Sequence, residues 1–441
     1  MSGIARMLLM ENVRVSGSDM RNGEVVNLLK KMGATVKVGH AAANIPDGTE
    51  LVVISAAIKE TNEEFIEARR RGIEIIKYAK ALGLLMAAQK GVAISGTHGK
   101  TTTTAMISMI LTAAGHDPSF VVGGYVPDLG TSSREGKNGI FVAEACEYDR
   151  SFLNLRPRVA IITNIEEDHL DYYKDLAEIV SAFKEFAGLL PKDGLLIVNA
   201  HDRNALNVAE TAHARVETYG SRIPADWRAE NLSATRGKFT FDVIGRGLPH
   251  GGITLAIPGV HNVLNALAAT AATRALGVDF DVIHNALASF HGAARRFQLV
   301  GEAQGVTIID DYAHHPTEIQ VTLKAARDFF RGGRLWVVFQ PHQYSRTRFF
   351  LKDFARSFSQ ADKVIVPDIY FVRDSDQERS TVNATDLVRE LVGLGYDAEY
   401  IPEWNAIVER ITREAERGDV VITMGAGNVD EVGRALLEKL R

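Results

Sequence analysis

The sequence predicts an α/β protein with three domains, and three observations support this prediction. A chain of 441 residues is too long for one hydrophobic core, and its length suggests about three domains. Hydrophobic residues make up 46% and charged residues 24% of the chain, proportions that are ordinary for a globular protein. Short runs rich in Val and Ile alternate with segments of helical period, which is the pattern of parallel sheets covered by helices.

The first unit, residues 1–88, is predicted to be a Rossmann-like domain. We expect strands and helices in short segments, namely strands 13–15, 35–38 and 51–54 and helices 24–32 and 62–71. The first of these strands leads to Asp19, as the second strand of a Rossmann-like unit leads to an acidic residue. Residues 1–10 have the pattern of the helix that follows a first strand, so we expect that strand upstream of Met1. A sheet without this central strand would have two unpaired edges.

The second unit, residues 89–298, is predicted to be a central domain with a mostly parallel sheet and a small antiparallel part. We expect parallel strands at 92–95, 141–143, 159–162 and 195–198, antiparallel strands at 238–243 and 252–257, and a helix at 263–276.

The third unit, residues 299–441, is predicted to be a doubly wound α/β domain. Helical patterns separate its expected strands, which are 306–309, 335–339, 363–367, 398–401 and 420–424.

Composition and charge exclude several classes of protein. A formal net charge of -5 gives no electrostatic reason to expect binding to nucleic acid or to an anionic membrane. The longest apolar runs contain charges or glycines well before twenty residues, so we expect no membrane-spanning segment. The single cysteine, Cys146, excludes an internal disulfide and fits a reducing compartment, which predicts a cytoplasmic protein. We expect Cys146 to be a small buried residue near the site.

Residues 92–104 form the strongest local motif, in which a strand runs into a glycine turn, a Lys-Thr pair and a helix. This order is typical of a P-loop, where backbone N–H groups and the helix N-terminus bind phosphate. Lys100 is expected to reach the β- and γ-phosphates of ATP, and the Thr101 hydroxyl is expected to bind Mg²⁺. Ile94 stands where the full Walker pattern has its first glycine, and the alternative is an ordinary turn with a surface lysine. A P-loop alone leaves kinase, pump and ligase open.

Polar residues follow two further predicted strands, and parallel strands end at one edge of their sheet. Glu144 follows strand 141–143, and Asn164 and His169 follow strand 159–162, so we expect all three beside the P-loop. A carboxylate and a neutral imidazole there suit a second Mg²⁺ ion. The alternative is that these three are solvated loop residues. We prefer this interpretation for the neighbouring acids Glu166, Glu167 and Asp168.

Longer runs of sequence resemble those of the Mur ligase family, and the similarity extends in order over essentially all 441 residues. The matching runs are 96–103, 144–147, 163–165 with 168–169, 261–265, 295–297, 310–316, 340–342 and 344–347. The run 310–316, Asp-Asp-Tyr-Ala-His-His-Pro, favours the member of the family that adds L-alanine over its siblings. The family also has a glycine-rich loop directly upstream of the position where this chain begins.

The resemblance implies an ATP-dependent ligase of peptidoglycan synthesis. ATP would phosphorylate the carboxylate of UDP-N-acetylmuramate, and the amine of L-alanine would attack the acyl phosphate, with two Mg²⁺ ions, or Mn²⁺ in their place. Lys100 would bind the transferring phosphate, Thr101 the first ion, and Glu144 with His169 the second. The remaining nucleotide contacts by resemblance are Gly96, Thr97, His98, Gly99 and Thr102 in the P-loop, Asn262 at the adenine, Asp311 at the ribose and Arg296 at the γ-phosphate.

By the same resemblance, Tyr312, His314 and Arg346 would surround L-alanine, and Arg346 would bind its carboxylate as a bidentate clamp. Ser55, after strand 51–54, is expected among the residues that bind the substrate. A metal site made of the adjacent His314 and His315 is disfavoured, because adjacent side chains point apart. Gln343 stands where many relatives have an arginine, which weakens a clamp of two arginines.

Two alternatives to this function stay open at this point. One is a sibling ligase that adds another amino acid or a peptide, because a single methyl group gives only about 1–3 kcal/mol of discrimination. The other is a non-catalytic regulator that binds nucleotide on the same scaffold. The missing N-terminal glycine-rich loop favours this alternative, and five intact residues disfavour it, namely Lys100, Thr101, Glu144, His169 and Arg296. A nucleic-acid-dependent ATPase is disfavoured by the lack of basic and aromatic runs.

Overall fold

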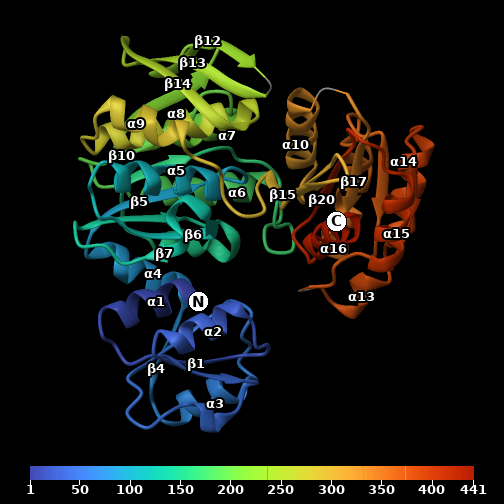
Figure 1. Ribbon diagram of the computed structural model, residues 1–441. Coiled ribbons are helices and arrows are strands. Elements are labelled where there is room, and N and C mark those ends of the chain that lie inside the picture. The colour runs from blue at the N-terminus through green and yellow to red at the C-terminus, as the bar shows by residue number, and fades with distance from the viewer. Residues whose placement is uncertain (236, 331, 373) are drawn as a thin grey trace.

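The computed structural model describes residues 1–235, 237–330, 332–372 and 374–441. The chain forms three successive parts, and in Figure 1 the C-terminal part stands beside the central part while the N-terminal part lies below it. Each part combines parallel strands with covering helices, so the predicted α/β fold with three sheet-containing parts is confirmed. No helix in the described ranges combines the length and the apolar character needed to cross a bilayer.

The N-terminal part contains two separate parallel strand pairs, β1–β2 and β3–β4. Within the described residues, each of these four strands therefore leaves one edge unpaired, and residues 2–10 form the expected helix. Its elements are α1 (Ser2–Met10), β1 (Ser16–Asp19), α2 (Glu24–Lys31), β2 (Thr35–Val38), η1 (Ala42–Asn44), β3 (Leu51–Ile54), α3 (Glu63–Arg70), β4 (Glu74–Lys77) and α4 (Tyr78–Ala87).

The prediction of a strand at 13–15 is wrong, because β1 begins at Ser16. The backbone N–H of Val13 still donates to the carbonyl of Leu8 in α1, so these residues complete the exit from the helix. Val13 thus belongs to the helix exit, whereas the Val15 carbonyl already accepts from the backbone N–H of Thr35 at 3.1 Å, directly before the parallel ladder that pairs Ser16 with Thr35.

The central part is built on a ten-stranded sheet in the order β14-β13-β12-β11-β10-β9-β5-β8-β6-β7. The strands from β12 to β6 in this order are parallel, while β13, β14 and β7 are antiparallel to their neighbours, so the prediction of a mostly parallel sheet is confirmed. The strands are β5 (Lys90–Ser95), β6 (Ser119–Val126), β7 (Thr131–Arg134), β8 (Ile140–Glu144), β9 (Pro157–Ile162), β10 (Leu195–Asn199), β11 (Arg215–Ser221), β12 (Trp227–Thr235), β13 (Lys238–Gly245) and β14 (Leu248–Pro258).

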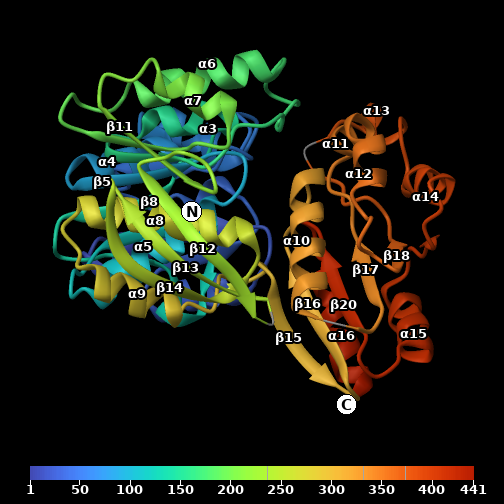
Figure 2. The ribbon, with the colours of Figure 1, turned by 90° about the horizontal axis from the view of Figure 1, so that it is seen from above.

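Helices cover both faces of this sheet, as Figure 2 shows from above. Successive residues of β5 point to opposite sides: Val92 and Ile94 join the core under α5, α8 and α9, and Ala93 joins the core under α4, α6 and α7. The helices and short turns are α5 (Lys100–Ala113), η2 (Pro127–Leu129), η3 (Tyr148–Asn154), α6 (Leu176–Ala187), α7 (Arg203–Ala209), α8 (Val260–Ala275) and α9 (Phe280–Ala288).

The C-terminal part is built on a six-stranded sheet in the order β15-β16-β20-β17-β18-β19, and only β15 is antiparallel to its neighbour. The prediction of a doubly wound domain is confirmed, although β15 was not predicted. The elements are β15 (Gln298–Ala303), β16 (Val306–Asp311), α10 (Pro316–Phe329), β17 (Leu335–Phe339), α11 (Tyr344–Phe349), α12 (Leu351–Arg356), β18 (Lys363–Val366), α13 (Asp376–Arg379), α14 (Ala384–Gly393), β19 (Ala398–Tyr400), α15 (Trp404–Glu414), β20 (Val420–Met424) and α16 (Asp430–Leu440). Helix α10 faces the central part (Figure 2).

Asp419 joins several elements of the C-terminal part through one buried carboxylate. It accepts hydrogen bonds from the backbone and side chain of Arg334, from the indole N–H of Trp336 at 3.1 Å and from the backbone N–H of Glu416 at 2.9 Å. The residue is only 3% exposed, so water is a poor substitute for these contacts. The start of β20 is thereby fixed against β17 and the end of α15.

We expect Asp419→Ala to lower the free energy of unfolding by about 3 kcal/mol or more, because each buried donor left unpaired costs about 1–3 kcal/mol. Urea unfolding followed by circular dichroism measures the change. Asp328→Ala is the control, because Asp328 pairs with Lys324 on the exposed side of α10 and should leave the midpoint unchanged. Equal midpoints for the two variants would contradict the role given to Asp419.

Candidate active site

The P-loop connects β5 to α5, and its backbone requires glycine at two positions. Gly96 has φ of 130°, and a Cβ atom there would lie 2.1 Å from the Thr163 hydroxyl. Gly99 has φ of 83° and is the N-cap of α5. Ile94, which departs from the Walker pattern, is a fully buried residue of β5. The loop therefore starts after Ser95, the last residue of β5, and its first sharp turn is at Gly96.

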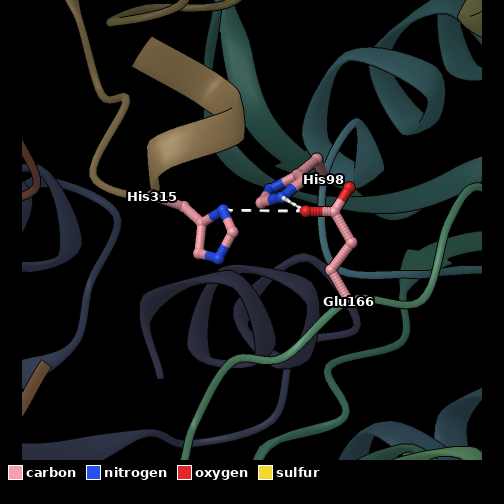
Figure 3. A group of neighbouring side chains, drawn as sticks. All are labelled: His98, Glu166 and His315. Carbon is pink, nitrogen blue, oxygen red and sulfur yellow. Dashed lines mark ion pairs between the residues drawn. The ribbon is translucent and has the colours of Figure 1, made fainter. Parts of the chain in front are cut away.

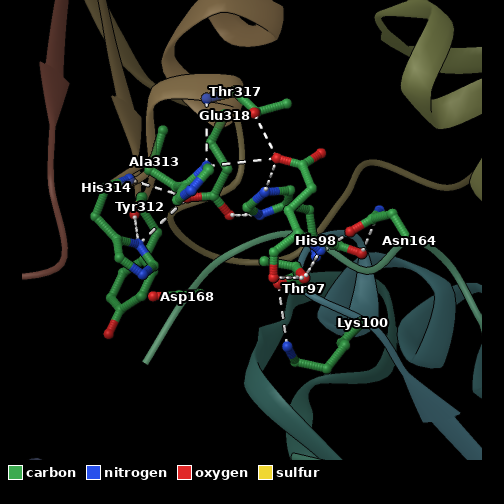
Figure 4. Close-up of polar contacts among 12 residues, drawn as sticks. Thr97, His98, Lys100, Asn164, Asp168, Tyr312, Ala313, His314, Thr317 and Glu318 are labelled. Carbon is green, nitrogen blue, oxygen red and sulfur yellow. Dashed lines mark hydrogen bonds and ion pairs between the residues drawn. The ribbon is translucent and has the colours of Figure 1, made fainter. Parts of the chain in front are cut away.

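The segment that follows β9 holds the P-loop in place, as Figure 4 shows for Asn164. The side-chain oxygen of Asn164 accepts a hydrogen bond from the backbone N–H of His98 at 2.8 Å. The backbone oxygen of Asn164 accepts one from the backbone N–H of Thr97 at 2.9 Å. In return, the Thr97 hydroxyl accepts from the backbone N–H of Glu166 at 2.9 Å. The ends of β5 and β9 therefore form one unit, with Asn164 beside the P-loop.

Lys100, the first residue of α5, forms a buried ion pair with Glu147. Its Nζ atom lies 3.0 and 3.1 Å from the two carboxylate oxygens and also donates to the Thr97 carbonyl. Burial lowers the pKa of Lys100, but the Glu147 carboxylate outweighs this effect and the pKa is raised above its ordinary value. Glu147 itself is 3% exposed, and Lys100 and His169 keep its pKa low against the opposing effect of burial. Lys100 is therefore charged.

Glu144 and His169 line the same cavity as Lys100. Glu144 ends β8, and its carboxylate accepts a hydrogen bond from the backbone N–H of Gly123. His169 has a left-handed backbone with φ of 54°, and its Nε2 atom lies 3.6 Å from the Glu147 carboxylate. Its Nδ1 atom is buried without a hydrogen-bond partner among the described residues.

Two cavities open from the P-loop, and His98, Gly99, Thr101 and Arg296 line both. The first cavity extends between α8 and α10, where Thr102, Asn262 and Asp311 are among its lining residues. The amide of Asn262 donates to the Pro258 carbonyl at 2.6 Å, and its oxygen accepts from Asn265 at 3.1 Å. Asn262 is thus held rigidly at the wall.

The second cavity has a volume of about 450 Å³ and joins the central and C-terminal parts. The central part contributes Lys100, Thr101, Glu144 and His169, and the C-terminal part contributes Tyr312, His314 and Arg346. Tyr312 and His314 lie between β16 and α10, and the centroids of their rings are 5.3 Å apart (Figure 4). Two of the predicted residues line neither cavity: Ser55, which directly follows β3, and Gly96, at the first sharp turn of the P-loop.

Arg346 forms an ion pair with Asp168, and both side chains are buried. The guanidinium Nη2 donates to the carboxylate at 2.6 Å, and the pair joins α11 to the loop after β9. Burial raises the pKa of Asp168, but Arg346 prevails and holds it well below its usual range. The prediction that Asp168 is a solvated loop acid is therefore wrong, while Glu167 is exposed as predicted.

Two further predictions about this region are corrected. Glu166 is only partly solvated, because its side chain is 35% exposed and accepts a hydrogen bond from the Thr317 hydroxyl at 2.6 Å across the two parts of the chain. Cys146 is not a buried residue, because it is exposed on the wall of the second cavity. Although Cys146 is exposed to this cavity, the protein around the cavity and the Glu147 carboxylate raise the pKa of its thiol to about 12. The thiol therefore stays protonated.

Two acidic residues of the site had no predicted role. Glu147 lies three residues after Glu144 at the same strand end. Its distance along the sequence from Lys100 does not indicate that the two side chains form an ion pair. Glu318 is four residues after His314, a spacing that places two side chains on one face of a helix start. Its carboxylate lies 3.1 Å from Nδ1 of His98 and accepts from the backbone N–H of His314 at 3.0 Å.

The buried carboxylate of Asp311, on the wall of the first cavity, should make the stability of the folded protein depend on pH. Its carboxylate accepts from the backbone N–H groups of Phe297 and Ala313, and burial raises its pKa to about 6 from an ordinary value of 3.8. Between these values the folded state binds more protons than the unfolded state, so stability falls as the pH rises.

We therefore expect the wild type to lose stability relative to Asp311→Asn as the pH rises from about 4 to about 6. Urea unfolding of both proteins at several pH values measures the difference, in which the other titrating groups cancel. A difference that does not change over this range would show that burial does not hold the proton on Asp311.

Sequence comparisons identify the family of this chain. The profile of the Mur ligase family, catalytic domain, matches residues 1–90, that of the Mur ligase middle domain matches 94–273, and that of the Mur ligase, glutamate ligase domain, matches 295–427. A UDP-N-acetylmuramate–L-alanine ligase of Caldanaerobacter subterraneus subsp. tengcongensis is 44% identical, over 100% of this chain and 95% of the relative.

Solved structures are similar over the whole chain as well. The UDP-N-acetylmuramate–alanine ligase of Thermotoga maritima is 29% identical, with a TM-score of 0.84 over 100% of this chain and 96% of that one. A murein peptide ligase of Psychrobacter arcticus is 26% identical, with a TM-score of 0.73 over 100% and 96% of the two chains. The sequence resemblance is thereby confirmed, and the chain belongs to the Mur ligase family.

Proposed function

We propose that the chain joins L-alanine to the carboxylate of UDP-N-acetylmuramate in an ATP-dependent reaction that passes through an acyl phosphate. The observation that carries this proposal is the second cavity, in which the P-loop lysine faces Tyr312, His314 and Arg346 from the C-terminal part. A phosphate-binding loop and an arginine suited to a carboxylate therefore share one enclosure. The ligase from Caldanaerobacter, 44% identical, has this activity in its name.

We assign the nucleotide to the first cavity. The Asn262 side chain, which is held rigidly at the cavity wall, suits contact with the adenine, and the Asp311 carboxylate suits a hydrogen bond from a ribose hydroxyl. The phosphates would lie at the start of α5, where backbone N–H groups and Lys100 attract negative charge. Thr102 and Arg296 would also contact the phosphates. Arg296 lines both cavities, so it can contact the γ-phosphate in either one.

The residues around Lys100 fit Mg²⁺. The Thr101 hydroxyl and the Glu144 carboxylate are hard oxygen donors on the wall of the second cavity, and the unpartnered Nδ1 of His169 is a buried nitrogen that needs a partner. Thr101 would hold one ion, and Glu144 with His169 a second. Bound Mg²⁺ neutralises charge that develops on the phosphates during transfer.

We assign the amino acid to the C-terminal wall of the second cavity. Arg346 would bind the carboxylate of L-alanine, with Asp168 holding the guanidinium in place at 2.6 Å. Burial lowers the pKa of His314 to about 4, so its imidazole is neutral at pH 7 and a weak base. It therefore suits contact with the substrate better than proton removal. The UDP-sugar is assigned to residues 1–88, with Ser55 at the carboxyl end of β3, where ligands bind parallel sheets.

The chemistry then follows in two steps. A carboxylate oxygen of UDP-N-acetylmuramate attacks the γ-phosphorus of ATP, and the bond to the β–γ bridging oxygen breaks and releases ADP. The unprotonated amine of L-alanine attacks the acyl carbon, phosphate leaves with the oxygen it received, and the amine nitrogen loses a proton. Exclusion of water by the two enclosing parts favours the amine over hydrolysis.

We expect phosphate release to require ATP, UDP-N-acetylmuramate and L-alanine together, and to fall by on the order of 10²–10³ in Lys100→Ala, because a cation at the transferring phosphate is lost. A coupled phosphate assay measures both effects, and a circular dichroism melt checks that the variant folds. Release that does not depend on the amino acid, or that is unchanged in Lys100→Ala, would contradict the proposal. A panel of amino acids and peptides in the same assay separates L-alanine from the substrates of sibling ligases.

We expect Arg346→Lys to raise the KM for L-alanine by roughly 10- to 100-fold, because a charge-assisted hydrogen bond contributes about 1.5–3 kcal/mol and lysine cannot bind bidentately. The matched control is Arg348→Lys, which makes the same change at an exposed position of α11. Initial rates at saturating ATP and UDP-N-acetylmuramate measure both. An equal KM for the two variants would remove Arg346 from the amino-acid site.

A further inference from the structure

His98, Glu166 and His315 form a second cluster of possible metal ligands, separate from Thr101, Glu144 and His169. Figure 3 shows the two imidazoles and the carboxylate pointing toward one another. His98 comes from the P-loop and Glu166 from the loop after β9, whereas His315 is the N-cap of α10 in the C-terminal part. The cluster therefore bridges two parts of the chain.

The distances in the cluster are close to those of a metal site. One carboxylate oxygen of Glu166 lies 3.5 Å from Nε2 of His98 and 3.8 Å from Nδ1 of His315, and all three ligand atoms lie within 4.8 Å of one another. Ligands at about 2.0–2.1 Å around a tetrahedral ion are about 3.3 Å apart. Small side-chain movements would bring the three atoms onto one ion.

Each imidazole is also oriented by a contact to its other ring nitrogen. Nδ1 of His98 lies 3.1 Å from Glu318, and Nε2 of His315 lies 3.1 Å from the carbonyl oxygen of Glu167. A carboxylate or carbonyl that accepts from the second ring nitrogen is the usual support of a metal-binding histidine, because it fixes the tautomer. Nε2 of His98 is buried and makes no hydrogen bond within the described ranges. That nitrogen points at Glu166.

The charge of the surroundings favours a cation at this point. Two carboxylates, Glu166 and Glu318, adjoin His98, and Arg296 lies 3.7 Å from Glu318. Nδ1 of His315 accepts the backbone N–H of Thr317 at 3.3 Å, so this nitrogen carries a lone pair. A bound ion would take that lone pair in place of the long contact to Thr317.

We propose that His98, Glu166 and His315 bind a divalent transition-metal ion, with Zn²⁺ as the best fit, and that this ion links the central and C-terminal parts. Two imidazoles and one carboxylate are a ligand set that suits Zn²⁺, whereas Mg²⁺ prefers oxygen ligands. The bound ion holds α10 against the P-loop in the arrangement seen here. This site is independent of the ions assigned to the phosphate transfer.

The test is titration calorimetry of the full chain with Zn²⁺ alone, in metal-free buffer without nucleotide. We expect one Zn²⁺ per chain, and an affinity that falls by more than tenfold in both His315→Asn and Glu166→Gln, because loss of a supporting partner already costs about 10- to 100-fold. Asparagine keeps an N-cap acceptor for α10 in place of His315. Using two variants keeps the test valid if one of them does not fold.

Two control variants separate this cluster from other sites. His169→Gln removes the nitrogen assigned to Mg²⁺, and His213→Asn removes a histidine in the loop before β11. We expect both to keep the Zn²⁺ affinity, and Zn²⁺ to raise the melting temperature of these variants and of the wild type. Affinity that is lost in His169→Gln and kept in His315→Asn would overturn the proposal, as would the absence of Zn²⁺ binding by the wild type.

Discussion

The carboxylate of Glu318 is the contact on which the assembled site depends. One of its oxygens faces His98 of the P-loop, and the other accepts the backbone N–H of His314 at 3.0 Å. Arg296 places a guanidinium 3.7 Å from the first oxygen. Burial raises the pKa of Glu318, but His314 and His98 outweigh this and hold it well below its usual range. One charged side chain in the first turn of α10 therefore orients groups from both parts of the chain.

The cations of the site are already paired with acids. Lys100 faces Glu147, and Arg346 faces Asp168, and both carboxylates are buried. A buried cation without a partner is strongly destabilising, so these acids make a highly charged enclosure compatible with a stable fold. Substrate phosphates and carboxylates would then bind to cations whose positions are fixed in advance. Such preorganisation is the main means by which an enzyme stabilises developing charge.

The sequence predicted the features that depend on local pattern. The strand, glycine turn and helix around Lys100 lie within thirteen residues, and the parallel sheet places Asn164 beside them. Features that depend on distant partners were missed. Asp168 and Glu166 were interpreted as solvated because their partners, Arg346 and Thr317, belong to another part of the chain. Hydrophobic periodicity describes which face of an element is buried, and it carries no information about ion pairs between domains.

The central claim is that the enclosure between the P-loop and the C-terminal part activates a carboxylate as an acyl phosphate. The most direct measurement uses UDP-N-acetylmuramate labelled with ¹⁸O in its carboxylate, together with ATP and L-alanine. Mass spectrometry then follows the label. Our account predicts one ¹⁸O atom in each phosphate released, because the carboxylate oxygen that attacks the γ-phosphorus leaves with it. Amide product accompanied by unlabelled phosphate would contradict the account.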